Sequence, residues 1–311
     1  MQLAFFGTPD FATAFLDALI KSHHDIRLVV STPDKPAGRG RKLQSPEVAI
    51  FAKEHNLSLL QPEDITSIEF LDSIENLDLD ACIVVSYGKI IKKELLDLPK
   101  HGFINVHPSL LPKYRGSTPI ESAIMAGEIT SGVTIMKMNE RVDAGDIILQ
   151  DEFEIGPDDN YADVLNKVTE IGPNLLLQVL KMIEDDTARY SPQDEGRATF
   201  TKKIEKQDLQ IDWNQKAEAI HNKVRAVYPN RSCYTYLNHI RIEIMKTKLT
   251  DQASTSPPGT IVRIDKEDII VATKELNLRI LRLKPENKKE MTAAAFARGY
   301  RSIEGLVFGY L

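Results

Sequence analysis

Short apolar runs alternate with helix-like segments through the first part of the chain. The runs occupy residues 3–7, 25–31, 81–88 and 102–106, and several are rich in Val and Ile without strict polar alternation. Strands that helices cover on both faces have this composition. Intervening stretches such as 11–24 repeat apolar residues at helical spacing. The pattern predicts an α/β fold with a Rossmann-like, parallel-rich sheet.

A later stretch, residues 161–186, also has helical spacing of its apolar residues. Gly172 and Pro173 interrupt it, and both residue types weaken or end a helix interior. We expect this segment to pack on the sheet as a helix that is broken at that point.

Beyond residue 207 the pattern changes. A helical segment at 217–227 is followed by short segments in which apolar and polar residues alternate, as in strands with one buried face. These segments cover residues 233–238, 240–249, 259–264, 268–273 and 276–284. They predict a small antiparallel domain, an OB-like β-barrel. The polar stretch 190–206 lacks apolar periodicity, so we expect a linker there between domains at 1–189 and 207–311.

Charge is divided unevenly along the chain. Its 311 residues are 42% hydrophobic, enough to bury a sizeable core, and the formal net charge is −6. Residues 205–311 carry +5, whereas residues 1–204 carry −11. A basic carboxyl-terminal third is expected if part of the surface meets a polyanion such as RNA. Chance variation is the alternative explanation.

The cysteines and the amino terminus indicate the compartment. Cys82 and Cys233 have neither metal-site spacing nor the pattern of a disulfide framework. The first residues lack a charged segment followed by a long apolar one, and no stretch reaches membrane-span length. We therefore expect a cytoplasmic protein that does not bind membranes.

The most informative polar residues stand at the end of the run 102–106. Asn105 and His107 are two positions apart, so an extended strand points both side chains the same way. The carboxyl end of a strand is where α/β folds place their sites. Asp143 lies in a glycine-containing turn after another apolar strand. An amide, an imidazole and a carboxylate suit acyl-type chemistry, although an isolated Asn-x-His is more simply a strand end.

With the residues that follow them, these three resemble the signature of the folate-dependent formyltransferases. The matching segment directly after the strand consists of Ser109, Leu110, Leu111 and Pro112. GTPDFA at 7–12 and TPDKPAGRGRK at 32–42 extend the resemblance over nearly the whole chain, to the branch of the family that acts on initiator methionyl-tRNA. The resemblance implies a monomeric enzyme that uses 10-formyltetrahydrofolate and no metal, and that supports translation initiation.

The resemblance also implies roles for the candidate residues. Asn105 and a protonated His107 would donate hydrogen bonds to the formyl oxygen, and Asp143 would raise the proton affinity of His107. The methionyl α-amino group would be the nucleophile. The folate would contact the segment from Ser109 to Pro112 and a second strand end. That second strand end comprises Ser86, Tyr87 and Gly88.

Basic residues in two regions are expected to contact tRNA. In the long loop at 32–46 they are Arg39, Arg41 and Lys42. In the carboxyl-terminal domain they are Lys206, Arg225, Lys246 and Lys248, with Arg231 and Arg241 as further members of a phosphate-facing stripe. Such contacts are electrostatic and depend on salt. Ordinary solvated charges are the alternative at each position.

Several other functions stay open at this stage. The loop at 7–12 lacks the remaining glycines of GxGxxG, which disfavours dinucleotide binding. Purine-nucleotide and amino-sugar nucleotide formyltransferases share the Asn, His and Asp arrangement, but they leave the basic loop unexplained. An inactive RNA-binding relative would keep the fold. Hydrolysis of formyl-folate would use the same residues with water as the nucleophile.

Overall fold

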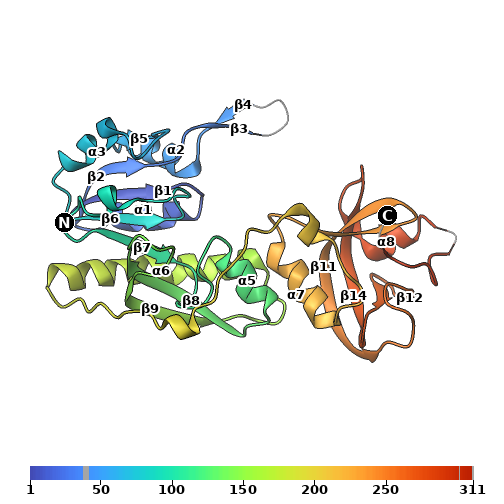
Figure 1. Ribbon diagram of the computed structural model, residues 1–311. Coiled ribbons are helices and arrows are strands. Elements are labelled where there is room, and N and C mark those ends of the chain that lie inside the picture. Colours follow the sequence, from blue (N-terminus) through green and yellow to red (C-terminus); the bar gives the residue numbers. More distant parts are fainter. Residues whose placement is uncertain (38–41, 301, 310–311) are drawn as a thin grey trace. The chain divides into compact units, whose positions relative to one another are not determined.

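The computed structural model describes residues 1–37, 42–300 and 302–309 (Figure 1). Its internal contacts divide the chain into two compact units. The first unit comprises residues 1–116, 131–153 and 165–200. The second comprises residues 117–130, 154–164 and 201–311. The units are interleaved in sequence, and a boundary at 190–206 stays a prediction.

A seven-stranded sheet forms the centre of the first unit. Its strand order is β5 (Leu59–Leu60), β2 (Asp25–Val30), β1 (Gln2–Gly7), β6 (Ala81–Val85), β7 (Phe103–His107), β8 (Thr130–Lys137) and β9 (Asp146–Glu154). The pairs from β5 to β7 are parallel, and β8 runs antiparallel to β7. The predicted parallel-rich α/β sheet is confirmed.

Helices cover this sheet because its central strands are apolar on both sides. One cluster joins Phe6 and Val84 of the strands to Phe70 and Leu95 of the helices α3 (Ile68–Glu75) and α4 (Lys93–Leu96). Three further helices complete the unit: α1 (Ala12–Ile20), α2 (Glu47–Glu54) and most of α6 (Tyr161–Glu184). Strands buried on both faces explain the continuous apolar runs in the sequence.

Helix α6 is continuous through Gly172 and Pro173, so the expected break is wrong. Gly172 is needed for close packing between helices. A Cβ on Gly172 would lie 2.6 Å from the ring of Phe15 on α1, closer than real Cβ contacts allow. The glycine therefore allows α6 to approach α1, and neighbouring packing outweighs the weak local propensity.

The second unit contains an antiparallel sheet with α7 (Ala217–Val227) and α8 (Ala293–Ala297). Its strand order is β10 (Cys233–Leu237), β11 (Ile240–Ala253), β14 (Leu276–Pro285), β13 (Ile269–Ala272) and β12 (Ile261–Ile264), with β15 (Met291–Thr292) beside β14. Trp213 packs in the core of this unit, where its Nε1 donates to Thr235 Oγ1 at 3.0 Å. Helix α5 (Pro119–Met125) packs on α7.

The antiparallel domain is confirmed, but its strands do not close into a barrel among the described residues. The ladder has two ends, β10 and β12, which do not pair with each other. The carboxyl-terminal segment forms only isolated bridges beside them, from Gly309 to Tyr236 and from Val307 to Thr260. The end strands β10 and β12 are only 5 and 4 residues long, and single bridges take the place of a continuous ladder beside them.

The basic loop contains a two-stranded ribbon of β3 (Lys35–Ala37) and β4 (Lys42–Gln44). Lys42 is exposed on β4. Arg39 and Arg41 lie outside the described residues. Within the described parts of the chain, every helix is too short or too polar to cross a lipid bilayer.

Candidate active site

The register of the sheet places Asn105 and His107 at the carboxyl-terminal ends of its central parallel strands. Asn105 of β7 pairs with Val84 of β6, and His107 pairs with Thr134 of β8. Asn105 is 8% exposed and His107 is 4% exposed. Both side chains belong to a strand that is buried along its whole length. A polar pair in such a strand costs free energy unless partners or a ligand satisfy it.

Asp143 reaches this edge through a tight turn after β8. Its φ of 48° is left-handed, a conformation that Asp tolerates better than most residues. The turn then passes so close to β8 that a Cβ on Gly145 would lie 1.8 Å from the carbonyl oxygen of Lys137. Only glycine fits there, which explains the glycine of the DAGD sequence.

The buried His107 pairs with the partly exposed Asp143, with 3.7 Å between Nδ1 and Oδ2. The backbone N–H of Gly116 donates to the same Oδ2 at 2.7 Å. The other ring nitrogen, Nε2, lies 3.0 Å from the carbonyl oxygen of Tyr114. A carbonyl only accepts, so Nε2 carries a proton. A neutral His107 therefore turns the bare Nδ1 toward the carboxylate, and the pair can take up one proton.

Burial lowers the pKa of His107, and the Asp143 charge and the Tyr114 carbonyl only partly oppose this effect. In the free protein the imidazole is therefore neutral near pH 7, which differs from the expected protonated form. The unfolded chain binds this proton more readily. The histidine therefore lowers the free energy of unfolding, and the fold becomes less stable, as the pH falls below 6.5. The site is set to accept a proton rather than to hold one.

Asn105 has its side chain available for a ligand. Among the described residues, none forms a hydrogen bond with its amide group. The amide nevertheless lies at a buried strand end two positions from His107. A preorganised donor in such a place is suited to an oxygen that gains negative charge.

A rigid turn follows β7 and contains the predicted folate segment. Ser109 is fully buried, and its Oγ donates to the Lys113 carbonyl at 2.7 Å. Thr134 Oγ1 donates to the Ser109 carbonyl at 2.6 Å, and Gln150 Nε2 donates to the Leu111 carbonyl at 3.0 Å. Leu111 is buried, whereas Leu110 and Pro112 are partly exposed. Hydrogen bonds within the turn and from side chains of β8 and β9 hold it, and it can present Leu110, Pro112 and backbone groups to a ligand.

The second predicted folate segment follows β6 and has mixed exposure. Ser86 and Gly88 are exposed, with φ values of 50° and 85°. Tyr87 between them is 1% exposed and packs edge-on against Phe6. Burial raises the pKa of Tyr87 to about 12. Its ring therefore belongs to the core, and only Ser86 and Gly88 are open to a ligand.

A partly buried hydrogen-bond network that was not predicted from the sequence supports the Asp143 turn. Gln193 Nε2 donates to the carbonyl oxygens of Asp143 and Gly145 at 2.9 and 2.8 Å. Its Oε1 accepts from Arg115 Nε and Nη2 at 3.0 and 2.8 Å. Arg115 is 1% exposed and also pairs with Glu195 at 3.0 Å. The segment that the sequence presents as a polar linker therefore fixes the backbone of the Asp143 turn.

The predicted cationic stripe is only partly on the surface. Lys206, Lys246 and Lys248 are exposed. Arg225 is 8% exposed, and its Nη1 donates to the carbonyls of Gly156 and Asp159 at 3.1 and 2.7 Å. These contacts lie within the second unit and use the guanidinium for structure, because burying a charge requires partners. Arg225 therefore does not belong to an open phosphate-facing surface.

The other two cations of the stripe also have contacts in the second unit. Arg231 Nη1 donates to the Ile204 carbonyl at 2.5 Å, and the Arg241 guanidinium lies 4.2 Å from the Tyr234 ring centroid. Both guanidinium groups therefore already have a partner within the protein.

Two family models cover most of the chain. The model described as "Formyl transferase" matches residues 1–180, and "Formyl transferase, C-terminal domain" matches residues 203–301. A relative named methionyl-tRNA formyltransferase, from Thermodesulfovibrio yellowstonii, is 41% identical over 98% of this chain and 97% of its own. A relative of the same name from Moorella thermoacetica is 38% identical over 99% of both chains.

Solved structures share the fold at lower identity. WlaRD, a sugar 3N-formyl transferase crystallised with dTDP and 5-N-formyl-THF, has a TM-score of 0.68 and 19% identity, covering 93% of this chain and 99% of its own. HypX from Aquifex aeolicus in complex with tetrahydrofolic acid has a TM-score of 0.66 and 18% identity, covering 96% of this chain and 47% of its own. At these identities the likeness concerns the fold alone.

The protonation of His107 can be measured directly. We predict an imidazole pKa below 6.5 in the free protein and a still lower pKa in Asp143→Asn, because that substitution removes the negative charge that raises it. NMR titration of the labelled histidine ring measures both values. A pKa above 6.5, or one that Asp143→Asn leaves unchanged, would contradict the description of the pair.

Proposed function

This chain belongs to the formyl transferase family, and from that premise we propose that it transfers a formyl group to the α-amino group of methionine on initiator tRNA. The observation that carries the proposal is the set of relatives named methionyl-tRNA formyltransferase, which match at 41% and 38% identity over nearly the full chain. The chain is a formyl-transferring enzyme with a folate donor. The finer identification of the donor as 10-formyltetrahydrofolate is part of the proposal.

Asn105, His107 and Asp143 carry the chemistry in this proposal. The neutral methionyl amine attacks the formyl carbon, a carbon–nitrogen bond forms, and the formyl oxygen becomes an oxyanion. The Asn105 amide donates to that oxygen, which such a donor stabilises by about 3 kcal/mol. The proton that leaves the amine moves to the His107 and Asp143 pair, where Nδ1 and Oδ2 are 3.7 Å apart.

The second half of the reaction returns this proton. The oxyanion collapses, the bond from the formyl carbon to folate N10 breaks, and N10 takes the proton from the pair. Charge and atoms balance without a further reactant. A protonated His107 exists only between the two halves, so the lowered pKa of the free imidazole suits the role of acceptor.

The edge of the sheet around β6 and β7 is the proposed folate site. Ser86 and Gly88 border the strand end on one side, and Leu110 and Pro112 border it on the other. Their exposed backbone groups and apolar atoms provide the mixed lining that a flat ring with a polar edge needs. Ser109, Leu111 and Tyr87 hold these segments in place from within the core.

Two exposed regions are the proposed tRNA contacts. The first is the basic ribbon that contains Lys42, together with Arg39 and Arg41 outside the described residues. The second is the set of exposed cations Lys206, Lys246 and Lys248 in the second unit. An amino-sugar acceptor would leave both regions without a purpose, which is why the tRNA substrate is preferred.

Transfer of labelled formyl tests the reaction and its donor residue together. We expect label to move from 10-formyltetrahydrofolate to methionyl-initiator tRNA, and Asn105→Ala to slow the transfer on the order of 100- to 1,000-fold. Asn76→Ala, an exposed asparagine at the end of α3, is the matched control and should keep full activity. Transfer to an amino-sugar nucleotide but not to tRNA would overturn the proposed acceptor.

Gln193 acts as a positioning residue for Asp143 in this proposal. Gln193→Leu removes both hydrogen bonds to the turn, so we predict a kcat lower on the order of 10- to 100-fold with little change in the KM for tRNA. The His107 pKa should fall as well, because the carboxylate moves away. A lower melting temperature with unchanged kcat and unchanged His107 titration would reduce Gln193 to a structural role.

Lys42 tests the ribbon as an RNA contact. Lys42→Ala should raise the KM for tRNA, reduce its salt dependence by a slope of about 1, and leave the KM for folate unchanged. Lys181→Ala, which removes an exposed lysine from α6, is the matched control. Equal effects of the two substitutions would mean that only net charge matters.

A further inference from the structure

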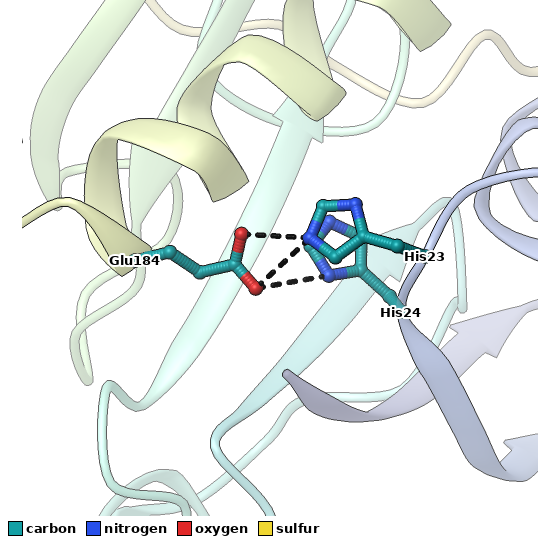
Figure 2. Close-up of side chains that lie close together, drawn as sticks. All are labelled: His23, His24 and Glu184. Carbon is teal, nitrogen blue, oxygen red and sulfur yellow. Dashed lines mark hydrogen bonds and ion pairs between the residues drawn. The ribbon is translucent and has the colours of Figure 1, made fainter.

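Three metal-ligating side chains converge in the first unit, away from the candidate active site. His23 and His24 precede β2, and Glu184 is the last residue of α6 (Figure 2). Figure 2 shows both imidazoles directed at the one carboxylate. Parallel strands begin at one edge of a sheet and end at the other, so this cluster and His107 lie at opposite edges. The proposed reaction does not involve these three residues, and the sequence patterns did not identify them.

The geometry is close to that of a metal site. His23 Nε2 lies 2.9 Å from Glu184 Oε2, and His24 Nδ1 lies 3.4 Å from Glu184 Oε1. One possible ligand atom from each residue lies within 4.8 Å of the others. Donors around a tetrahedral zinc ion with bonds of 2.0–2.1 Å are about 3.3 Å apart. Small side-chain rotations would therefore bring the three donors around one ion.

The direction of the two histidines is unusual for neighbours in sequence. Consecutive residues of an extended chain point to opposite sides, but His23 lies in a bend before β2, and the rings of His23 and His24 lie side by side with centroids 4.2 Å apart. The His24 side chain is 1% exposed, whereas that of His23 is 69% exposed. The cluster therefore has one buried ligand that fixes its position and one that is open to an ion arriving from solvent.

The donor set determines which ions fit. Two imidazoles and one carboxylate are the ligands of many zinc sites, with a fourth position left for water. Imidazole also suits copper and nickel, whereas magnesium and calcium prefer oxygen donors. The amino group of Met1 lies 3.0 Å from Glu184 Oε1. It also lies 3.4 Å from His24 Nδ1, so an ion bound to that nitrogen would replace this contact, while Glu184 Oε2 already faces His23.

We propose that His23, His24 and Glu184 form a binding site for a divalent transition-metal ion, with zinc as the representative. The ion would join the end of α6 to the start of β2, segments about 160 residues apart in sequence. Such a cross-link stabilises the first unit, because the folded chain holds the ligands together and the unfolded chain does not. The ion takes no part in formyl transfer.

Zinc titration of the full, tag-free chain tests the site. After removal of metal with EDTA, calorimetry should show one zinc ion per chain, and zinc should raise the melting temperature. His23→Ala should weaken binding by about tenfold or more, since it removes a ligand. Its exposed side chain makes a folding defect improbable as an explanation. Glu184→Gln keeps the size of the side chain, removes its charge and should abolish the zinc-dependent rise in melting temperature.

Two controls make the result specific. His55→Ala removes an exposed histidine outside the cluster and should bind zinc as the unmodified chain does. A large excess of magnesium should not displace the zinc. The proposal is overturned if the unmodified chain binds no zinc, if His23→Ala binds it as tightly, or if His55→Ala weakens binding to the same extent.

Discussion

The candidate active site depends on keeping a carboxylate beside an imidazole that is almost fully buried. Burial disfavours charge on His107, yet Asp143 Oδ2 stays 3.7 Å from its Nδ1. The backbone N–H of Gly116 stabilises the carboxylate, and the Tyr114 carbonyl fixes which ring nitrogen carries the proton. Together these contacts create a place for one more proton. An amine that attacks a formyl carbon releases one.

The rest of the first unit can be understood as support for this pair. The parallel strands bring Asn105 and His107 to the edge, and the DAGD turn brings Asp143 to meet them. Gly145 allows the turn to approach β8, and Gln193 holds its carbonyls from behind. The buried Arg115 in turn fixes Gln193. A hydrogen-bond donor and a proton acceptor are effective when folding has already placed them, because no free energy is then needed to arrange them during the reaction.

The sequence predicted what local pattern and residue chemistry determine. Apolar runs identified the sheet, and the spacing of Asn105 and His107 placed them on one side of a strand. Patterns could not reveal which residues pack together from distant segments. Gln193 lies in a polar stretch without periodicity, and only the fold shows it beneath Asp143. Arg225 has the composition of a phosphate ligand, but its burial against backbone carbonyls depends on tertiary packing. Continuous α6 likewise reflects packing that outweighs Gly172 and Pro173.

A double-mutant cycle in single-turnover formyl transfer tests the central claim most directly. Rates would be measured for the unmodified chain, His107→Gln, Asp143→Asn and the double variant, with methionyl-initiator tRNA as acceptor. If the two residues share one proton, the double variant should be no slower than the slower single variant, because either substitution already destroys the pair. Additive losses would mean that His107 and Asp143 act independently, and the account of the site as one proton acceptor would be wrong.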